Sequence, residues 1–150
     1  MRDICYWQQI YKKILFISFY IVILQGNQWK EEMKKILVAE DTESNYLLLS
    51  IILRKEYEVH RAHDGQEAIE KFESCRPDMI LMDIKMPVMD GLEATRRIRL
   101  KGGTLPIIAL TANAYDSDRD KAFEAGCDDY MAKPIMAPAL REMIKKYFGE

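Results

Sequence analysis

Residues 78–91, with the sequence DMILMDIKMPVMDG, decide the fold of this chain. They open with residues 79–82, a run in which every side chain is apolar. Such a run is typical of a strand buried on both faces of a parallel sheet. Asp83 follows the run directly, and a charged helix with Leu92 and Ile98 facing inward is predicted over residues 91–99. The stretch therefore predicts a strand, an acidic residue at its end and a helix beyond it.

The same alternation of strand and helix continues on both sides of this stretch. Residues 36–39 and 107–110 are also apolar runs, as in buried strands. Apolar and polar side chains alternate over residues 57–62, and the run at residues 130–132 is short, so both are predicted to be edge strands. We therefore predict an α/β fold with a doubly wound, flavodoxin-like parallel sheet of five strands in the order 2-1-3-4-5 and five helices. The predicted helices cover residues 43–55, 66–72, 91–99, 117–125 and 137–148.

The composition is that of a globular protein. Of the 150 residues, 49% are hydrophobic and 31% are charged, which excludes a wholly disordered chain. The 22 basic and 24 acidic residues leave no positive excess, so we expect no nucleic-acid binding by this chain alone. The basic stretch 96–101 is expected to be a solvated helix face. Three cysteines without a CxxC pair argue for a reducing compartment, and we predict a cytoplasmic location.

The first 32 residues do not follow the pattern of the rest. Residues 14–24, ILFISFYIVIL, are apolar except for Ser18, but a membrane-spanning helix needs about 20 such residues. Met33 opens MKKILVAED, which suits a domain that begins with a strand. We predict that residues 1–32 are an N-terminal extension, or a translation-start error, outside the functional domain formed by residues 33–150. The alternative is that residues 14–24 anchor the chain to a membrane or a partner.

Polar residues stand directly after four of the predicted strands. Glu40 and Asp41 follow the first strand, Asp83 the third and Thr111 the fourth, and Lys133 lies just past the fifth. In an open parallel sheet these positions share the edge where ligands bind. Three carboxylates close together repel one another, and oxygen ligands alone suit Mg²⁺. An Asp beside such an ion can attack phosphorus and form an aspartyl phosphate, with Lys133 neutralising charge and Thr111 donating a hydrogen bond.

Four motifs in continuous order carry a resemblance to a known family. They are ILVAED at residues 36–41, DMILMDIKMPVMDGLEATRRIR at 78–99, PIIALTANA at 106–114 and GCDDYMAKPI at 126–135. Together they resemble the receiver domains of response regulators and hybrid histidine kinases, over about residues 34–150. This resemblance implies a two-component phosphorelay. The domain would take a phosphoryl group from a histidine kinase or a histidine phosphotransfer domain and switch a partner-binding surface.

The resemblance also implies a metal site. Asp83 would be the phosphoacceptor, and Asp41, Asp83 and the backbone carbonyl of Lys85 would bind Mg²⁺ directly. Glu40 would act on the metal largely through water. The acidic pair of this chain is Glu-Asp, where the common family pattern is Asp-Asp, and we expect activity to survive this difference. Lys85 and Asn113 would flank the path of the attacking water, so we predict that they tune hydrolysis of the phosphoryl group.

Further roles are implied on the phosphoryl side of the site. Thr111 and Lys133 would contact the phosphoryl group, together with the backbone N–H of Ala112. Thr111 and Tyr130 resemble the coupled switch pair of the family, in which the hydroxyl moves inward and the ring follows. Pro134 after Lys133 implies a cis peptide bond, which is uncommon before proline and marks a constrained turn.

Two other functions remain open. The first is a pseudo-receiver, a binding module without phosphotransfer, which would be expected to lack one of Asp41, Asp83, Thr111 and Lys133. The second is a phosphatase with an Asp nucleophile. Such enzymes place a second acid two residues after the nucleophile, where this chain has Lys85. We therefore expect a switch that phosphorylates and dephosphorylates itself, with a downstream target that the sequence does not name, and not a turnover enzyme.

Overall fold

The computed structural model describes residues 33–112 and 116–149, and Met33–Glu150 forms one compact unit. The predictions for residues 1–32, including the anchor at residues 14–24, lie outside the described residues, as does the role of Asn113. In the part of the chain that the structure describes, no helix has both the length and the apolar character needed to cross a bilayer.

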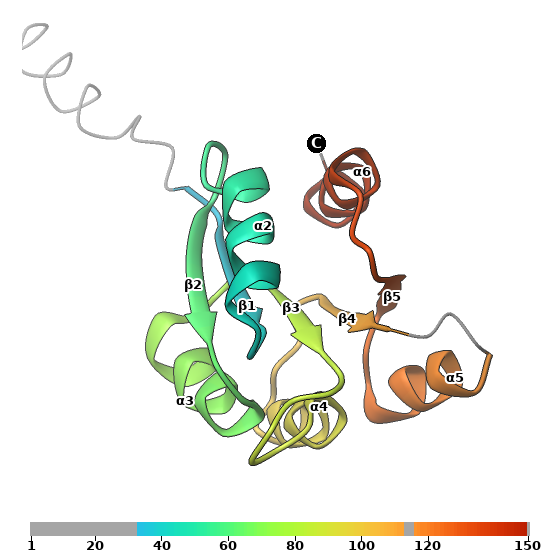
Figure 1. Ribbon diagram of the computed structural model, residues 1–150. Coiled ribbons are helices and arrows are strands. Elements are labelled where there is room, and N and C mark those ends of the chain that lie inside the picture. Colours follow the sequence, from blue (N-terminus) through green and yellow to red (C-terminus); the bar gives the residue numbers. More distant parts are fainter. Residues whose placement is uncertain (1–32, 113–115, 150) are drawn as a thin grey trace, which may run out of the picture. The chain divides into compact units, whose positions relative to one another are not determined.

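A five-stranded parallel sheet forms the framework of the unit (Figure 1). Its strands are β1 (Lys35–Ala39), β2 (Glu58–Ala62), β3 (Met79–Asp83), β4 (Ile107–Thr111) and β5 (Asp129–Ala132). The order is β2-β1-β3-β4-β5 with every pair parallel, which confirms the predicted order. β3 and β4 are buried along their whole length, whereas β2 and β5 lie at the edges and are partly exposed.

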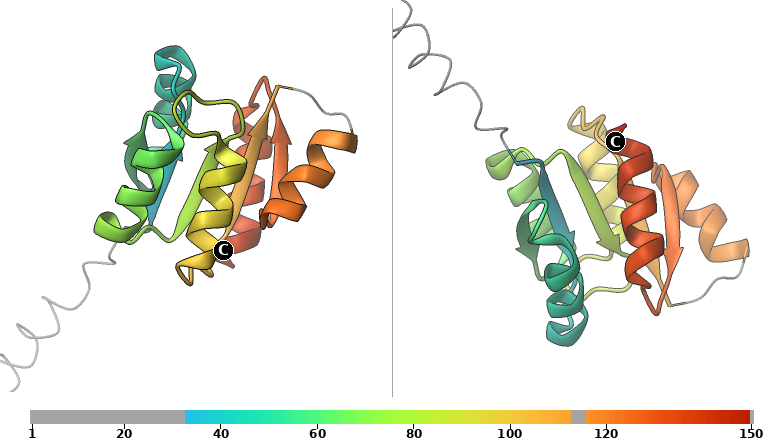
Figure 2. Two further views of the ribbon diagram at one scale, coloured as in Figure 1. Left: turned by 90° about the horizontal axis from the view of Figure 1, so that it is seen from below. Right: turned by 90° about the horizontal axis from the view of Figure 1, so that it is seen from above.

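Helices cover both faces of this sheet. They are α2 (Glu43–Leu53), α3 (Gly65–Cys75), α4 (Gly91–Leu100), α5 (Asp116–Ala125) and α6 (Ala137–Phe148). Leu49 of α2 and Leu140 of α6 belong to one buried cluster, with Val38 of β1 between them. Ala68 of α3 and Ile98 of α4 belong to a second cluster on the opposite face, to which α5 also contributes. Figure 2 shows these two layers, with α2 and α6 on one side and α3, α4 and α5 on the other.

The turn from β3 into α4 fixes the end of the central strand. Asp90 caps α4, because its carboxylate accepts the backbone N–H of Glu93 at 2.8 Å. The N–H of Gly91 donates to the carbonyl of Ile84 at 2.9 Å. A Cβ on Gly91 would lie only 2.1 Å from the carbonyl oxygen of Asp83. Glycine is therefore required for α4 to start this close to the last residue of β3.

Some sequence-based boundaries and one surface assignment were wrong. The helix predicted over residues 66–72 runs over Gly65–Cys75. It begins at Gly65 because the Asp64 carboxylate caps its first turn by accepting the N–H of Glu67 at 2.8 Å, and it ends where Arg76 takes a left-handed backbone conformation. Arg99 was assigned to a solvated helix face. Its guanidinium instead donates to three backbone carbonyls and to the carboxylate of Asp128 at 2.7–2.8 Å, which ties the end of α4 to the loops around it.

Candidate functional site

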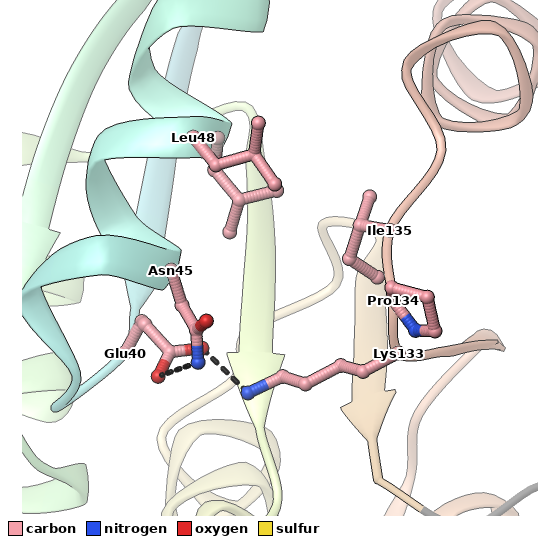
Figure 3. Close-up of a pocket in the computed structure, with 7 residues that line it drawn as sticks. Glu40, Asn45, Leu48, Lys133, Pro134 and Ile135 are labelled. Atoms are coloured by element: carbon pink, nitrogen blue, oxygen red, sulfur yellow. Dashed lines mark hydrogen bonds and ion pairs between the residues drawn. The ribbon is translucent and has the colours of Figure 1, made fainter.

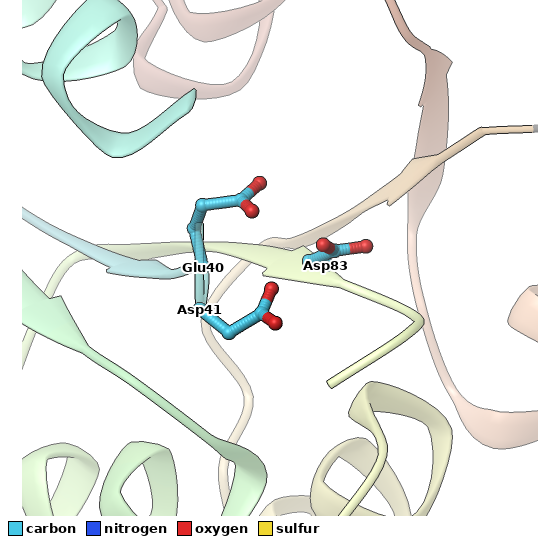
Figure 4. Close-up of side chains that lie close together, drawn as sticks. All are labelled: Glu40, Asp41 and Asp83. Atoms are coloured by element: carbon cyan, nitrogen blue, oxygen red, sulfur yellow. The ribbon is translucent and has the colours of Figure 1, made fainter. Parts of the chain in front are cut away.

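Three carboxylates meet at the carboxyl ends of β1 and β3. Glu40, Asp41 and Asp83 each offer an oxygen atom, and these atoms lie within 4.8 Å of one another (Figure 4). β1 and β3 are neighbouring strands, paired so that Ala39 lies beside Met82, which brings the residues that end them together. Glu40 and Asp83 are buried, whereas Asp41 is exposed. The predicted convergence of these carboxylates at one sheet edge is therefore seen in the structure.

Lys133 brings a positive charge to this acidic cluster. Its Nζ donates to Oε2 of Glu40 at 2.6 Å and to Oδ2 of Asp83 at 2.8 Å. The side chain reaches them from the loop after β5, whose position is set by the Lys133 N–H donating to the Thr111 carbonyl at 2.7 Å. The peptide bond between Lys133 and Pro134 is cis, as predicted. One ammonium thus bridges two buried carboxylates from different strands.

The electrostatics of the cluster favour a charged Lys133. Burial raises the pKa of the Asp83 carboxyl above its ordinary value, against the opposing effect of the Lys133 ammonium. Burial alone would lower the pKa of Lys133, but its hydrogen bonds to Asp83 and Glu40 outweigh burial and raise that pKa. Lys133 therefore stays protonated, and the ionised form of Asp83 is the one that burial disfavours.

The remaining predicted site residues stand at the same edge of the sheet as Asp83. Its Oδ1 accepts the backbone N–H of Lys85 at 3.2 Å, so the loop after β3 folds back over the carboxylate. Thr111 is the last residue of β4 and is buried, and Ala112 follows it. β4 pairs with β3 so that Leu110 lies beside Asp83, which puts Thr111 at the same edge as the carboxylates. The structure brings these residues to the predicted positions, while their roles stay predictions.

Tyr130 lies in β5, on the side of the sheet covered by α5. Its ring meets the ring of Phe123 edge to face, with 6.2 Å between centroids. The guanidinium carbon of Arg119 lies 5.5 Å from the Tyr130 centroid and 5.7 Å from that of Phe123. Phe123 is exposed, so Ala122 and Ala125 are the only deeply buried side chains among those described for α5. A cation and two aromatic rings therefore form a partly exposed surface at α5 and β5.

Asn45 was not predicted as a site residue from the sequence. Its side-chain amide donates to Oε1 of Glu40 at 3.1 Å (Figure 3). The one available signal was spacing, because Asn45 stands in the first turn of the helix that follows Glu40 and Asp41. The same region contains a small cavity of about 80 Å³. Its lining combines the polar Glu40, Asn45 and Lys133 with the apolar Leu48, Leu49, Pro134 and Ile135.

Known proteins resemble this unit in sequence. The family model described as the response regulator receiver domain matches residues 36–145. The hybrid signal transduction histidine kinase G of Dictyostelium discoideum is 44% identical over 119 residues, which are 75% of this chain but 4% of that protein. The chain thus spans only a small part of such kinases. The polar-differentiation response regulator DivK of Brucella anthropi is 38% identical, over 78% of this chain and 98% of that protein.

Solved structures share the fold as well. The receiver domain of the sensor histidine kinase PA1611 from Pseudomonas aeruginosa, determined with a magnesium ion coordinated in its active site cleft, is 40% identical with a TM-score of 0.73. The match covers 79% of this chain and 99% of that one. The receiver domain of Ssk1 from Saccharomyces cerevisiae, crystallised with the histidine phosphotransfer protein Ypd1, is 32% identical with a TM-score of 0.73. That match covers 77% of this chain and 88% of the other.

Proposed function

The chain belongs to the response regulator receiver family of two-component signalling, and on this basis we propose that Asp83 accepts a phosphoryl group from a phosphohistidine donor. The observation that carries the proposal is the ammonium of Lys133, held at 2.8 Å from Oδ2 of Asp83. A buried carboxylate at a strand end is a nucleophile in a fixed place, and the ammonium is a fixed positive charge beside it. Phosphoryl transfer relies mainly on such positioning and charge neutralisation.

The transfer exchanges one bond to phosphorus for another. An oxygen of the Asp83 carboxylate forms a bond to phosphorus while the bond from phosphorus to the donor imidazole nitrogen breaks. The electron pair of the broken bond stays on that nitrogen, and the histidine leaves without its phosphoryl group. We propose that the Lys133 ammonium, the Thr111 hydroxyl and the backbone N–H of Ala112 hold the phosphoryl oxygens. Water can later hydrolyse the acyl phosphate and reset the switch.

The donor set at this edge fits Mg²⁺. Its side-chain donors are the carboxylates of the acidic cluster, and Asp41 is exposed enough to turn its carboxylate toward an ion. We propose Asp41, Asp83 and the carbonyl of Lys85 as direct ligands. Both oxygens of Glu40 already accept hydrogen bonds from the protein, which supports an indirect role for Glu40. The ion would supply positive charge to the transferring group. The related PA1611 receiver domain holds a magnesium ion in its cleft.

We propose that the phosphohistidine partner docks on α2. Leu47, Leu48 and Ile51 of this helix are exposed, and so is Met136 just before α6. Exposed apolar side chains gathered beside a reactive group are typical of a protein-binding surface. Leu48 also lines the cavity that reaches Lys133, so a partner here would lie next to the acceptor. The Ssk1 receiver domain, which resembles this unit, forms a complex with a histidine phosphotransfer protein.

We propose that Thr111 and Tyr130 report phosphorylation to a downstream target. Tyr130 packs against exposed Phe123 of the lightly anchored α5, so a turn of its ring would change this surface. Beryllofluoride with Mg²⁺ mimics a bound phosphoryl group. It should shift the ring resonances of Tyr130 in the wild type and leave them unshifted in Thr111→Val. Resonances that stay the same in both proteins would contradict this coupling.

The experiment that tests the function uses the full chain, Mg²⁺ and phosphoramidate, a small donor whose P–N bond resembles that of phosphohistidine. Intact mass should increase by one phosphoryl group, and a chelator should prevent the increase. A folded protein that never gains this mass would instead support the pseudo-receiver. Steady turnover of a phosphomonoester would support the phosphatase.

We also propose that residues 33–150 are the working domain, with residues 1–32 outside it, and that the protein acts in the cytoplasm.

A further inference from the structure

The carboxylate of Glu40 is held by three donors, two at the start of α2 and one in the loop after β5. The side chain is 0% exposed. Its Oε1 accepts the backbone N–H of Thr42 at 3.2 Å and the side-chain amide of Asn45 at 3.1 Å. Its Oε2 accepts the Lys133 ammonium at 2.6 Å (Figure 3). A buried carboxylate is stable only when such donors occupy its oxygens, and their positions fix the plane of the group.

We propose that Asn45 is a positioning residue of the phosphoacceptor site, which acts through Glu40 to hold the Lys133 ammonium against Asp83. The inference rests on the proposed function, because it extends the same site by one residue. The contacts run in one line, from the Asn45 amide to Oε1 of Glu40, from Oε2 of Glu40 to Lys133, and from Lys133 to Oδ2 of Asp83. An ionised carboxylate only accepts hydrogen bonds, so Asn45 donates.

The position of Asn45 explains why another residue of the same turn does not take its place. Asn45 is half-buried on the face of α2 toward the sheet edge, whereas its neighbour Ser44 is exposed. The hydroxyl of Thr42 is 3.4 Å from the Asp41 carboxylate, so Thr42 reaches Glu40 only through its backbone. Without the Asn45 amide, Oε1 keeps one contact of 3.2 Å, so the plane of the Glu40 carboxylate is less firmly held. Lys133 then loses the fixed geometry of its 2.6 Å contact.

The test compares Asn45→Ala with Asn45→Asp, and both with the matched control Ser44→Ala in the same helical turn. Each full-length variant is phosphorylated with phosphoramidate and Mg²⁺, and the initial rate is followed by intact mass. Asn45→Ala should be about tenfold slower than the wild type, the size expected for one hydrogen bond to a charged group. Asn45→Asp keeps the shape of the side chain but adds a negative charge beside Glu40, so it should be slower still. A purely packing role would leave Asn45→Asp at the wild-type rate.

A double-mutant cycle tests the path through Glu40. In a Glu40→Ala background, Asn45→Ala should cause no further slowing, because the carboxylate that Asn45 holds is absent. An undiminished tenfold effect in that background would overturn the inference. Thermal unfolding of each variant confirms that the rates belong to folded protein.

A second readout does not depend on phosphorylation. In protein labelled with ¹⁵N-lysine, the Lys133 ammonium should give a slowly exchanging signal, assigned by its loss in Lys133→Arg. The signal should broaden or vanish in both Asn45 variants and persist in Ser44→Ala; a persistent signal in all variants would overturn the inference. If the wild type gains no phosphate, the proposed function fails while this signal still tests Asn45. If the wild type is phosphorylated and both Asn45 variants match Ser44→Ala, only the role of Asn45 fails.

Discussion

The Nζ of Lys133 lies 2.8 Å from Oδ2 of Asp83, although the two residues are 50 positions apart in the sequence. Asp83 ends β3 and Lys133 follows β5, and β4 separates these strands in the sheet. The Lys133 side chain therefore crosses the end of β4 to reach the carboxylate. The contact forms only when β3, β4 and β5 lie side by side in this order. Removing it should therefore affect both the chemistry of the site and the stability of the fold.

Removing the Lys133 ammonium should destabilise the fold. Lys133→Ala leaves the carboxylates of Glu40 and Asp83 buried without their shared cation. Breaking a buried pair typically costs more than making it gains, and for a side chain 21% exposed we expect a loss of about 2 kcal/mol. Lys146→Ala is the control, since it removes an exposed pair with Asp129 and should change stability little. Urea unfolding measures both, and equal losses would contradict the account.

Neutralising Asp83 should stabilise the protein at neutral pH. The raised pKa of Asp83 means that the folded state binds the proton more tightly than the unfolded chain does, so ionisation costs stability above that pKa. Asp83→Asn removes this cost, keeps an oxygen that can accept a hydrogen bond from Lys133 and leaves Lys133 paired with Glu40, so it should unfold at a higher temperature than the wild type. As the pH falls through the raised pKa, the wild type becomes protonated and the difference should shrink. If the difference in unfolding temperature between Asp83→Asn and the wild type widened on acidification, the pKa of Asp83 would not be raised in the folded state.

Gly91→Ala should disturb the end of β3. The added Cβ would lie 2.1 Å from the Asp83 carbonyl oxygen and 2.8 Å from Cγ of Met82, so α4 must move away. Overpacking of this kind costs about 2 kcal/mol. Thr104→Ala, in an exposed loop, is the control and should be near neutral. Chemical unfolding of the two variants gives the comparison, and a Gly91→Ala protein as stable as the control would show that the contact is not tight.

A negative charge on the exposed face of α2 should weaken docking of the partner without changing the reaction of Asp83 with a small phosphodonor. Ile51→Asp places a carboxylate in the proposed docking surface at a side chain that does not line the cavity with Lys133, and Leu100→Asp places one on α4, where Leu100 is 87% exposed. Transfer from a phosphorylated histidine phosphotransfer domain that serves the wild type should fall about tenfold or more in Ile51→Asp alone. Phosphorylation by phosphoramidate should be unchanged in both. Equal transfer to the two variants would place docking elsewhere.

The strand order could be predicted because buried strands and edge strands have different patterns of apolar residues. β3 and β4 are apolar up to their last residues, Asp83 and Thr111, since helices cover both their faces, and the edge strand β2 alternates. The carboxylates and Lys133 could be placed because they stand at strand ends. Asn45 could not, because an asparagine in the first turn of a helix has no distinctive pattern. Its contact with Glu40 depends on how closely α2 packs on the sheet, which only the tertiary structure sets.

Chemical mapping can locate the phosphoryl group itself. The full-length protein is phosphorylated with phosphoramidate and Mg²⁺, reduced with borohydride, digested and mapped by mass spectrometry. Borohydride reduces an acyl phosphate to an alcohol, so we expect Asp83, and no other residue, to be converted to homoserine. Conversion of Asp41 or another carboxylate instead, or no conversion in protein shown to be folded, would contradict the assignment of Asp83 as the phosphoacceptor.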